Sequence, residues 1–161
     1  MPLPNVMPDI KQYYPFDFEF THIVKEIKAP VSIYSSRNSI EGKCIKIDAL
    51  WDTGASISVL SPKLVHELAL SPVDNWYVGG IDNEISSDVV IITMILPNGM
   101  VLTDKRFSVC NIPGVEVLIG MDIISMGDFS ISNANGKTLF SFVMPPYKNK
   151  ISYSKLINEQ K

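Results

Sequence analysis

Ala49-Leu-Trp-Asp-Thr-Gly-Ala-Ser-Ile-Ser-Val-Leu60 is the most informative stretch of this sequence. It places one acidic residue, Asp52, between two apolar segments with the character of β-strands. Burying an unpaired carboxylate is costly, so an acid between two such strands needs a structural or chemical reason. Gly54 permits a close backbone approach that a side chain would forbid, and the Thr53 hydroxyl can lock the turn by hydrogen bonding. Asp-Thr-Gly is also common in plain turns, so the tripeptide alone leaves both interpretations open.

Outward from this stretch, short alternating segments and turn residues predict an all-β fold. A short helix is expected after Ser61, which can cap it, with Pro62 at the first helical position. Many short strands with one or two small helices are typical of a barrel-like architecture. The expected strands are 16–24, 31–34, 44–51, 57–60, 89–96, 101–102, 107–110 and 115–119, followed by a hairpin over 129–142.

The chain length of 161 residues suits one domain with short appendages. We expect an irregular, proline-rich N-terminal arm over 1–15, a domain over 16–146 that includes the hairpin 129–142, and a polar tail over 147–161. The tail contains a few apolar residues that could form a weak helix or fray.

Charge and cysteine content exclude several classes of protein. The net charge of −3 carries no electrostatic signature of a nucleic-acid partner. No apolar run approaches the ~20 residues of a membrane helix, and the N-terminus lacks the features of a secretory signal. Cys44 and Cys110 have no metal-ligand spacing, so we expect reduced core residues in a cytoplasmic protein without metal or cofactor.

A second motif follows the first along the chain. Val115-Glu-Val-Leu-Ile-Gly-Met-Asp-Ile-Ile124 provides an apolar strand, a glycine and a short helical turn. The two motifs in this order resemble the retropepsin family of aspartic proteases, the retroviral-type proteases and their cellular and bacterial relatives. The resemblance runs from roughly Cys44 to Ser125 and implies a closed β-barrel of the acid-protease type.

The resemblance also implies site residues. Asp52 becomes the catalytic aspartate, Thr53 joins a hydrogen-bonded lattice between two subunits, and Gly54 presents its backbone to the substrate main chain. Val78-Gly-Gly-Ile81 is similar to the flap that closes over bound peptide. The implied substrate-binding residues are Ala55, Val59, Val78, Gly79, Gly80 and Ile81.

This sequence departs from the retroviral pattern at two linked positions. Retroviral members usually carry an acidic residue where this chain has Ser56, and an arginine where it has Met121. Those two charges pair in the family. Losing both together leaves no unpaired buried charge, so the change is compatible with a folded dimer. The expected flap also has Asp82-Asn83 where retroviral members carry more glycine.

A single Asp-Thr-Gly implies two chains. Peptide hydrolysis of this kind uses two close carboxylates that share a proton, one as general base and one as general acid. The sequence contains one such motif, so the second carboxylate must come from an identical chain across a two-fold axis. We therefore expect an Asp52/Asp52 dyad in a homodimer that cleaves an extended peptide.

Two other hypotheses remain open from the sequence. A retropepsin-like dimer could bind peptides or protein partners without cutting them. Alternatively, a structural β-domain could use Asp52 only to cap a turn.

Overall fold

The computed structural model describes residues 12–78 and 85–160. The described strands are β1 (Tyr14–Glu19), β2 (Ile27–Tyr34), β3 (Cys44–Trp51), β4 (Val59–Leu60), β5 (Asp74–Val78), β6 (Ile85–Ile95), β7 (Val101–Val109), β8 (Val117–Ile119), β9 (Asp128–Ser132) and β10 (Leu139–Met144). The described helices are short: α1 (Pro62–Glu67), α2 (Met121–Ile124), α3 (Tyr153–Asn158) and the 3₁₀ turn η1 (Ala134–Gly136).

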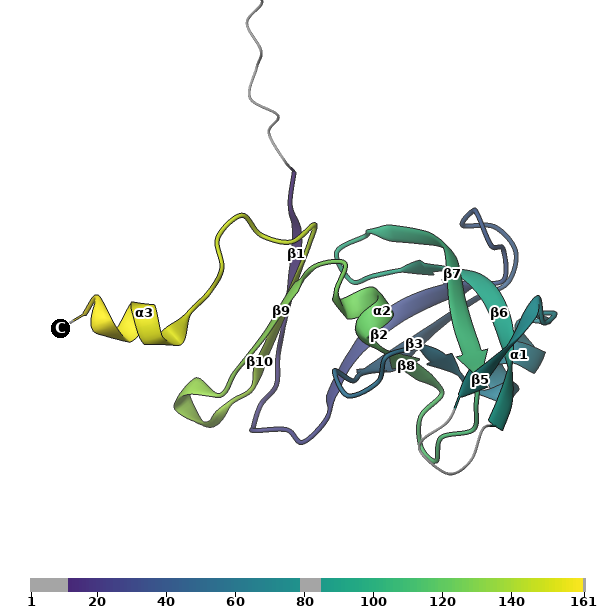
Figure 1. The fold of residues 1–161 in the computed structure, drawn as a ribbon, viewed down its shortest axis with the longest axis horizontal. Helices are drawn as coiled ribbons and strands as arrows, with labels where there is room; N and C mark the ends of the chain where they lie inside the picture. Colours follow the sequence, from purple (N-terminus) through teal and green to yellow (C-terminus); the bar gives the residue numbers. More distant parts are fainter. Residues whose placement is uncertain (1–11, 79–84, 161) are drawn as a thin grey trace, which may run out of the picture.

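Six strands close into a barrel, which confirms the predicted all-β class (Figure 1). The order β2-β3-β8-β4-β7-β6 returns to its start because β6 also pairs with β2. Closure leaves these strands without an open sheet edge, the usual site of unwanted pairing. Strand β5 pairs antiparallel with β6 and extends the sheet as a hairpin.

The alternation of β2 shows how sequence periodicity builds the core. Its residues alternate between buried and half-buried along the whole strand. Ala29 and Ile33 are fully buried, and Val31 is 2% exposed. Their intervening neighbours face outward, as the two-residue period of a strand requires. The capped helix was also predicted correctly: the Ser61 hydroxyl accepts a hydrogen bond from the Leu64 amide, with Pro62 at its start.

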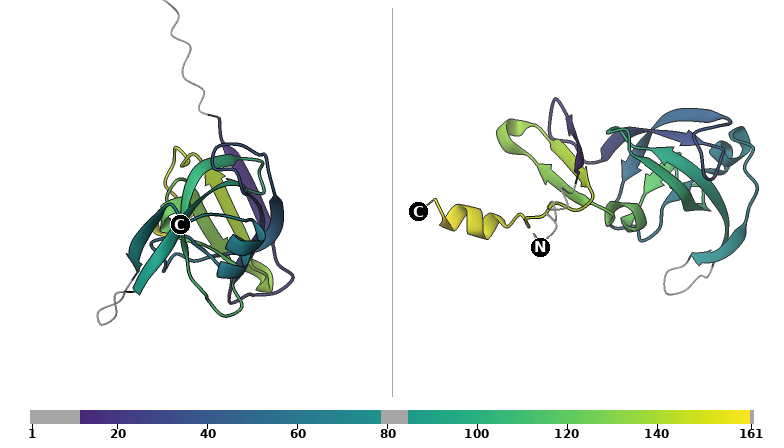
Figure 2. Two further views of the ribbon diagram at one scale, coloured as in Figure 1. Left: turned by 90° about the vertical axis from the view of Figure 1, so that its right-hand side faces the viewer. Right: turned by 90° about the horizontal axis from the view of Figure 1, so that it is seen from above.

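A second, three-stranded sheet packs against the barrel. Its order is β1-β10-β9, and it contains the predicted hairpin (Figures 1 and 2). Its inner face presents Phe16, Phe140 and Phe142 to Trp51, the last residue of β3. The Trp51 ring lies 5.1 Å, centroid to centroid, from Phe140 and from Phe142. The terminal strands are thereby fixed against the residue that precedes Asp52.

Two expectations were wrong in detail. The segments 101–102 and 107–110 were predicted as separate strands, but β7 runs continuously from Val101 to Val109. Asp104 has a φ of 53° and the β6–β7 register shifts nearby, so a bulge interrupts the alternation and hides the continuity. Cys44 and Cys110 are free but exposed, because they lie at strand ends outside the core.

The chain termini extend from these two sheets. Strand β1 begins at Tyr14, and residues 1–11 of the expected arm lie outside the described residues. Within the tail, α3 contains no buried residue and lies beyond the three-stranded sheet, away from the barrel (Figures 1 and 2). No helix in the described ranges combines the length and apolarity that crossing a bilayer requires.

Replacing Phe140 with alanine tests the docking of the two sheets. The Phe140 side chain is fully buried against Phe16, Trp51 and Phe129, so its loss should lower the free energy of unfolding by about 3–5 kcal/mol. Leu139→Ala is the matched control, because its side chain is 36% exposed, and it should cost about 0.5 kcal/mol. Chemical denaturation measures both. Equal losses would contradict the packing of this face on the barrel.

Candidate active site

The Asp52 loop is a turn built around one carboxylate. The Asp52 amide donates to the Ile119 carbonyl at 2.9 Å, which ties the start of the loop to β8. The Gly54 amide donates to Asp52 Oδ1 at 2.8 Å, and the Ala55 amide donates to the Asp52 carbonyl at 3.2 Å. A Cβ at position 54 would lie 3.1 Å from Asp52 Oδ1. The turn therefore favours glycine at this position.

Only one oxygen of the Asp52 carboxylate forms a hydrogen bond with another described residue. Within residues 12–78 and 85–160, Asp52 Oδ2 has no hydrogen-bond partner, whereas Oδ1 caps the turn. Asp52 is half-buried, and Thr53 and Gly54 at the loop tip are exposed. The next expected site residues, Ala55 and Val59, are half-buried. The loop thus presents an acceptor oxygen and an exposed hydroxyl together.

The second motif packs directly behind the first. An ideal Cβ on Gly120 would lie 2.8 Å from the Ile57 carbonyl carbon and 2.9 Å from the Ala55 oxygen. These are backbone atoms that cannot move aside like a side chain, so the contact requires glycine. The Met121 amide donates to the same Ala55 oxygen at 2.8 Å. The strand-glycine-helix motif therefore holds the Asp52 loop from behind.

Ser58 and Asp122 form a hydrogen-bonded pair that sequence reasoning missed. The Ser58 hydroxyl donates to Asp122 Oδ1 at 2.7 Å, and the Ser58 amide donates to Oδ2 at 3.1 Å. The same hydroxyl accepts from the Gly120 amide at 3.0 Å, and Ser58 is fully buried. A serine between apolar residues just after an acidic motif was the available signal, but its partner lies far along the chain.

The two departures from the retroviral pattern lie at the surface. Ser56 is exposed, and Met121 is 38% exposed. Neither position leaves a buried charge without a partner. The Ser58–Asp122 pair connects the same two segments through hydrogen bonds from a neutral residue to a carboxylate. Such charge-assisted bonds are stronger than neutral ones.

A cavity opens beside Leu50, two residues before Asp52. Trp51 points into the core, so Leu50 lies on the opposite face of β3, which ends at Trp51. The register places Lys28 and Leu118 beside Leu50, on β2 and β8. A cavity of about 340 Å³ opens here, lined by Lys28, Ile47, Asp48, Leu50, Gly114, Val115 and Glu116.

A second cavity adjoins the first along the loop before β8. It measures about 430 Å³ and shares Gly114, Val115 and Glu116 with the first cavity. Glu116 accepts hydrogen bonds from the Ser61 hydroxyl and from Lys63 Nζ, the latter at 3.1 Å. Those two hydrogen bonds hold the pKa of Glu116 below its ordinary value. Glu116 is therefore a carboxylate at neutral pH.

The expected flap is described only in part. Val78 ends β5 and pairs with Ile85 across the β5–β6 hairpin. Gly79, Gly80 and Ile81, together with Asp82-Asn83, lie outside the described residues. The structure therefore describes β5 and β6, which flank this segment, as an antiparallel pair.

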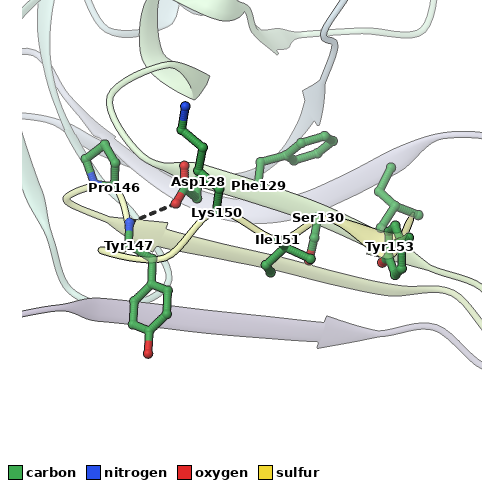
Figure 3. A pocket seen from close by; sticks show the side chains of 9 residues that line it. Asp128, Phe129, Ser130, Pro146, Tyr147, Lys150, Ile151 and Tyr153 are labelled. Atoms are coloured by element: carbon green, nitrogen blue, oxygen red, sulfur yellow. Dashed lines mark hydrogen bonds between the residues drawn. The ribbon is translucent and has the colours of Figure 1, made fainter. Parts of the chain in front are cut away.

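A larger cavity, of about 690 Å³, lies away from Asp52. It opens between β9 and the tail, where the Tyr147 amide donates to Asp128 Oδ2 at 2.8 Å (Figure 3). Phe129, Ile131 and Ile151 contribute apolar walls. No cluster of histidine, cysteine and acidic residues able to hold a metal occurs in the part of the chain that the structure describes.

Comparison with known proteins identifies one matching family model and several similar solved structures. A family model described as gag-polyprotein putative aspartyl protease matches residues 37–126, more than half of the chain and both motifs. No curated protein matches the sequence.

Similar solved structures include a retropepsin-like aspartic protease from Rickettsia conorii, with 12% identity, TM-score 0.49, and coverage of 83% of this chain and 96% of that chain. The EIAV protease complexed with the inhibitor HBY-793 has 22% identity and TM-score 0.45, covering 62% of this chain and 86% of that one. The retroviral protease-like domain of Ddi1 from Leishmania major has 16% identity and TM-score 0.45, covering 73% and 95% respectively.

Replacing Ser58 with alanine tests the support of the loop. The change removes an acceptor from the Gly120 amide and a donor from Asp122 in a buried site, so it should cost about 1–3 kcal/mol of unfolding free energy. Ser56→Ala, two residues away and exposed, should change stability by no more than about 0.5 kcal/mol. Thermal or chemical denaturation compares the two. Similar small effects would show that the buried pair contributes little.

Proposed function

This chain belongs to the gag-polyprotein putative aspartyl proteases, a retropepsin-like family, and on that premise we propose that it is an aspartic endopeptidase active as a homodimer. The observation that carries the proposal is the state of the Asp52 carboxylate. Oδ1 holds the turn, whereas Oδ2 has no hydrogen-bond partner among the described residues, and Asp52 is half-buried. A turn cap uses one acceptor oxygen, so the second oxygen of this half-buried carboxylate is available to act on a ligand.

The proposed reaction uses one Asp52 from each subunit. The ionised carboxylate takes a proton from a water molecule while the water oxygen attacks the peptide carbonyl carbon. The protonated Asp52 of the second subunit donates its proton to the carbonyl oxygen. As the tetrahedral intermediate breaks down, the first Asp52 gives the proton it took from water to the leaving nitrogen and the C–N bond breaks. The second Asp52 takes back a proton from a hydroxyl of the intermediate as the carbonyl re-forms. Two carboxylates this close cannot both ionise, which separates their apparent pKa values and assigns the two roles.

The exposed loop tip supports a second subunit as the source of the other acid. The sequence contains one Asp-Thr-Gly motif. Thr53 is exposed next to the half-buried Asp52, so its hydroxyl is available to bond across a two-fold axis. In this proposal Gly54 faces the substrate backbone, since no side chain separates it from the cleft.

The proposed substrate is an extended peptide that lies along the outward face of β3 and β8. In this proposal Ala55 and Val59 contribute to the wall of the cleft, and the role of the flap is assigned to Val78, Gly79, Gly80 and Ile81. Backbone hydrogen bonds of the β type would supply affinity, and the cavities beside Leu50 would supply side-chain selection.

A second candidate is a dimer that binds peptides without cutting them. The absence of the charged pair at Ser56 and Met121 favours it, because that pair supports the dimer and the cleft floor in retroviral members. In this alternative the cleft and its cavities still accept an extended segment, but the two Asp52 carboxylates do not activate water.

Asp52→Asn is the direct test of catalysis. We expect the wild-type protein to cleave members of a mixed peptide library at mildly acidic to neutral pH, and the variant to lose cleavage at least 10³-fold, roughly the scale of removing a general base. Mass spectrometry identifies the products, and a statine-type transition-state mimic should block them. Asp17→Asn, on the exposed face of β1, should retain full activity. Peptide binding without cleavage by wild-type protein would favour the second candidate.

Subunit mixing tests the shared dyad. An excess of Asp52→Asn protein, equilibrated with wild-type protein to allow exchange, should suppress activity in proportion to the mixed dimers formed, because each contains one functional aspartate. The same excess of Asp17→Asn protein should not suppress it. Light scattering monitors the dimer in parallel. Unchanged activity in the presence of a demonstrated mixed dimer would contradict a dyad built from both chains.

A further inference from the structure

The cavity beside Leu50 is placed to receive a substrate side chain. Leu50 lies on the outward face of β3 near its end at Trp51, and Asp52 follows Trp51 directly, so the Cα atoms of Leu50 and Asp52 are at most roughly 7 Å apart along the chain. An extended peptide has the same two-residue spacing on each of its faces. A side chain in this cavity would therefore belong to a residue within about two positions of the bond above Asp52.

The polar lining of this cavity is predominantly acidic. Asp48 and Glu116 contribute carboxylates, and Lys28 contributes the one cation among the lining residues. Lys28 Nζ lies 2.9 Å from Glu26 Oε2, so its charge is already balanced by an acid outside the lining. Asp48 is exposed and has no hydrogen-bond or ion-pair partner among residues 12–78 and 85–160. Glu116 is in turn paired with Lys63, so the unbalanced charge at this cavity is the negative charge of Asp48.

The Glu116 carboxylate is held in a fixed position by two hydrogen bonds. The Ser61 hydroxyl binds Oε2 and Lys63 Nζ lies 3.1 Å from Oε1, which fixes the carboxylate in the wall between the two cavities. Each carboxylate oxygen can accept two hydrogen bonds, so one site on each oxygen remains. The Glu116 side chain is 33% exposed, whereas Lys63 is 72% exposed and weakly screens it. An additional donor could bind without displacing either partner.

We propose, as an extension of the proposed function, that this cavity selects a lysine or arginine side chain of the substrate, with Glu116 and Asp48 as its acceptors. The walls formed by Leu50 and Val115 suit the methylene stem of such a side chain. A purely apolar side chain would cover the Asp48 carboxylate without a compensating donor, which is unfavourable. An acidic side chain would be repelled.

Peptide binding to the Asp52→Asn dimer tests this proposal independently of catalysis. The probes are fluorescein-labelled octapeptides with two apolar residues at the centre. Arginine, its neutral isostere citrulline, or glutamate is placed at each flanking position in turn. Fluorescence anisotropy measures each Kd at a fixed ionic strength. We expect arginine to bind about tenfold more tightly than citrulline at one position, and glutamate to bind most weakly there.

Three further variants locate the effect, each made in the Asp52→Asn background. Glu116→Gln and Asp48→Asn should each reduce the arginine-to-citrulline ratio by about threefold. Asp17→Asn removes the same charge from β1 and should leave the ratio unchanged, which controls for general electrostatic attraction. Circular dichroism checks the fold of the Glu116 variant. If the Glu116→Gln variant unfolds, the Asp48→Asn variant still tests the proposal, because the Asp48 side chain has no hydrogen-bond or ion-pair partner in the described structure.

The outcomes separate this inference from the catalytic one. Equal Kd values for arginine and citrulline at every position, a ratio unchanged in both acidic variants, or no peptide binding at all would overturn the proposal for the cavity. Absence of cleavage by wild-type protein, with the arginine preference intact, would overturn catalysis and leave the cavity assignment standing.

Discussion

The contact between Gly120 and the backbone of residues 55–57 is the constraint on which the site depends. The 2.8 Å separation from an ideal Cβ to the Ile57 carbonyl carbon leaves no room for any side chain. This approach brings the Met121 amide to the Ala55 oxygen and the Gly120 amide to the Ser58 hydroxyl. The loop that carries Asp52 is thereby held by β8 and α2, elements that lie far from it along the chain.

The terminal sheet extends that support to the other side of β3. Trp51 is packed by Phe16, Phe140 and Phe142, so the residue adjacent to Asp52 belongs to a rigid aromatic cluster. Its indole nitrogen is buried without a hydrogen-bond partner among the described residues, at a cost of about 1–3 kcal/mol. Burial of three phenylalanine rings, each stabilising by about 1.5–3 kcal/mol, outweighs that cost.

Hydrogen bonds connect the two motifs of this chain, whereas retroviral members usually have an ion pair at the positions of Ser56 and Met121. Ser56 and Met121 lie at the surface, while the fully buried Ser58 binds the exposed Asp122 and connects the same segments. A hydroxyl-to-carboxylate bond avoids the desolvation of a second charge, which often makes buried ion pairs unfavourable. The unbalanced negative charge of the cavity beside Leu50 is that of Asp48, because Glu116 is paired with Lys63.

The sequence by itself determined the all-β class, the cap of α1, the hairpin after α2 and the position of Asp52 in a turn after an apolar strand, because each depends on local periodicity or on residues within a few positions. It also indicated the family through two motifs in order. The pairing of Ser58 with Asp122, the packing of Trp51 by the terminal sheet and the acidic cavity at Glu116 were decided by tertiary structure. They join residues from separate strands, and strand register rather than local spacing brings such residues into contact. The bulge at Asp104 and the exposure of Cys44 and Cys110 also depend on how the strands pair rather than on local spacing.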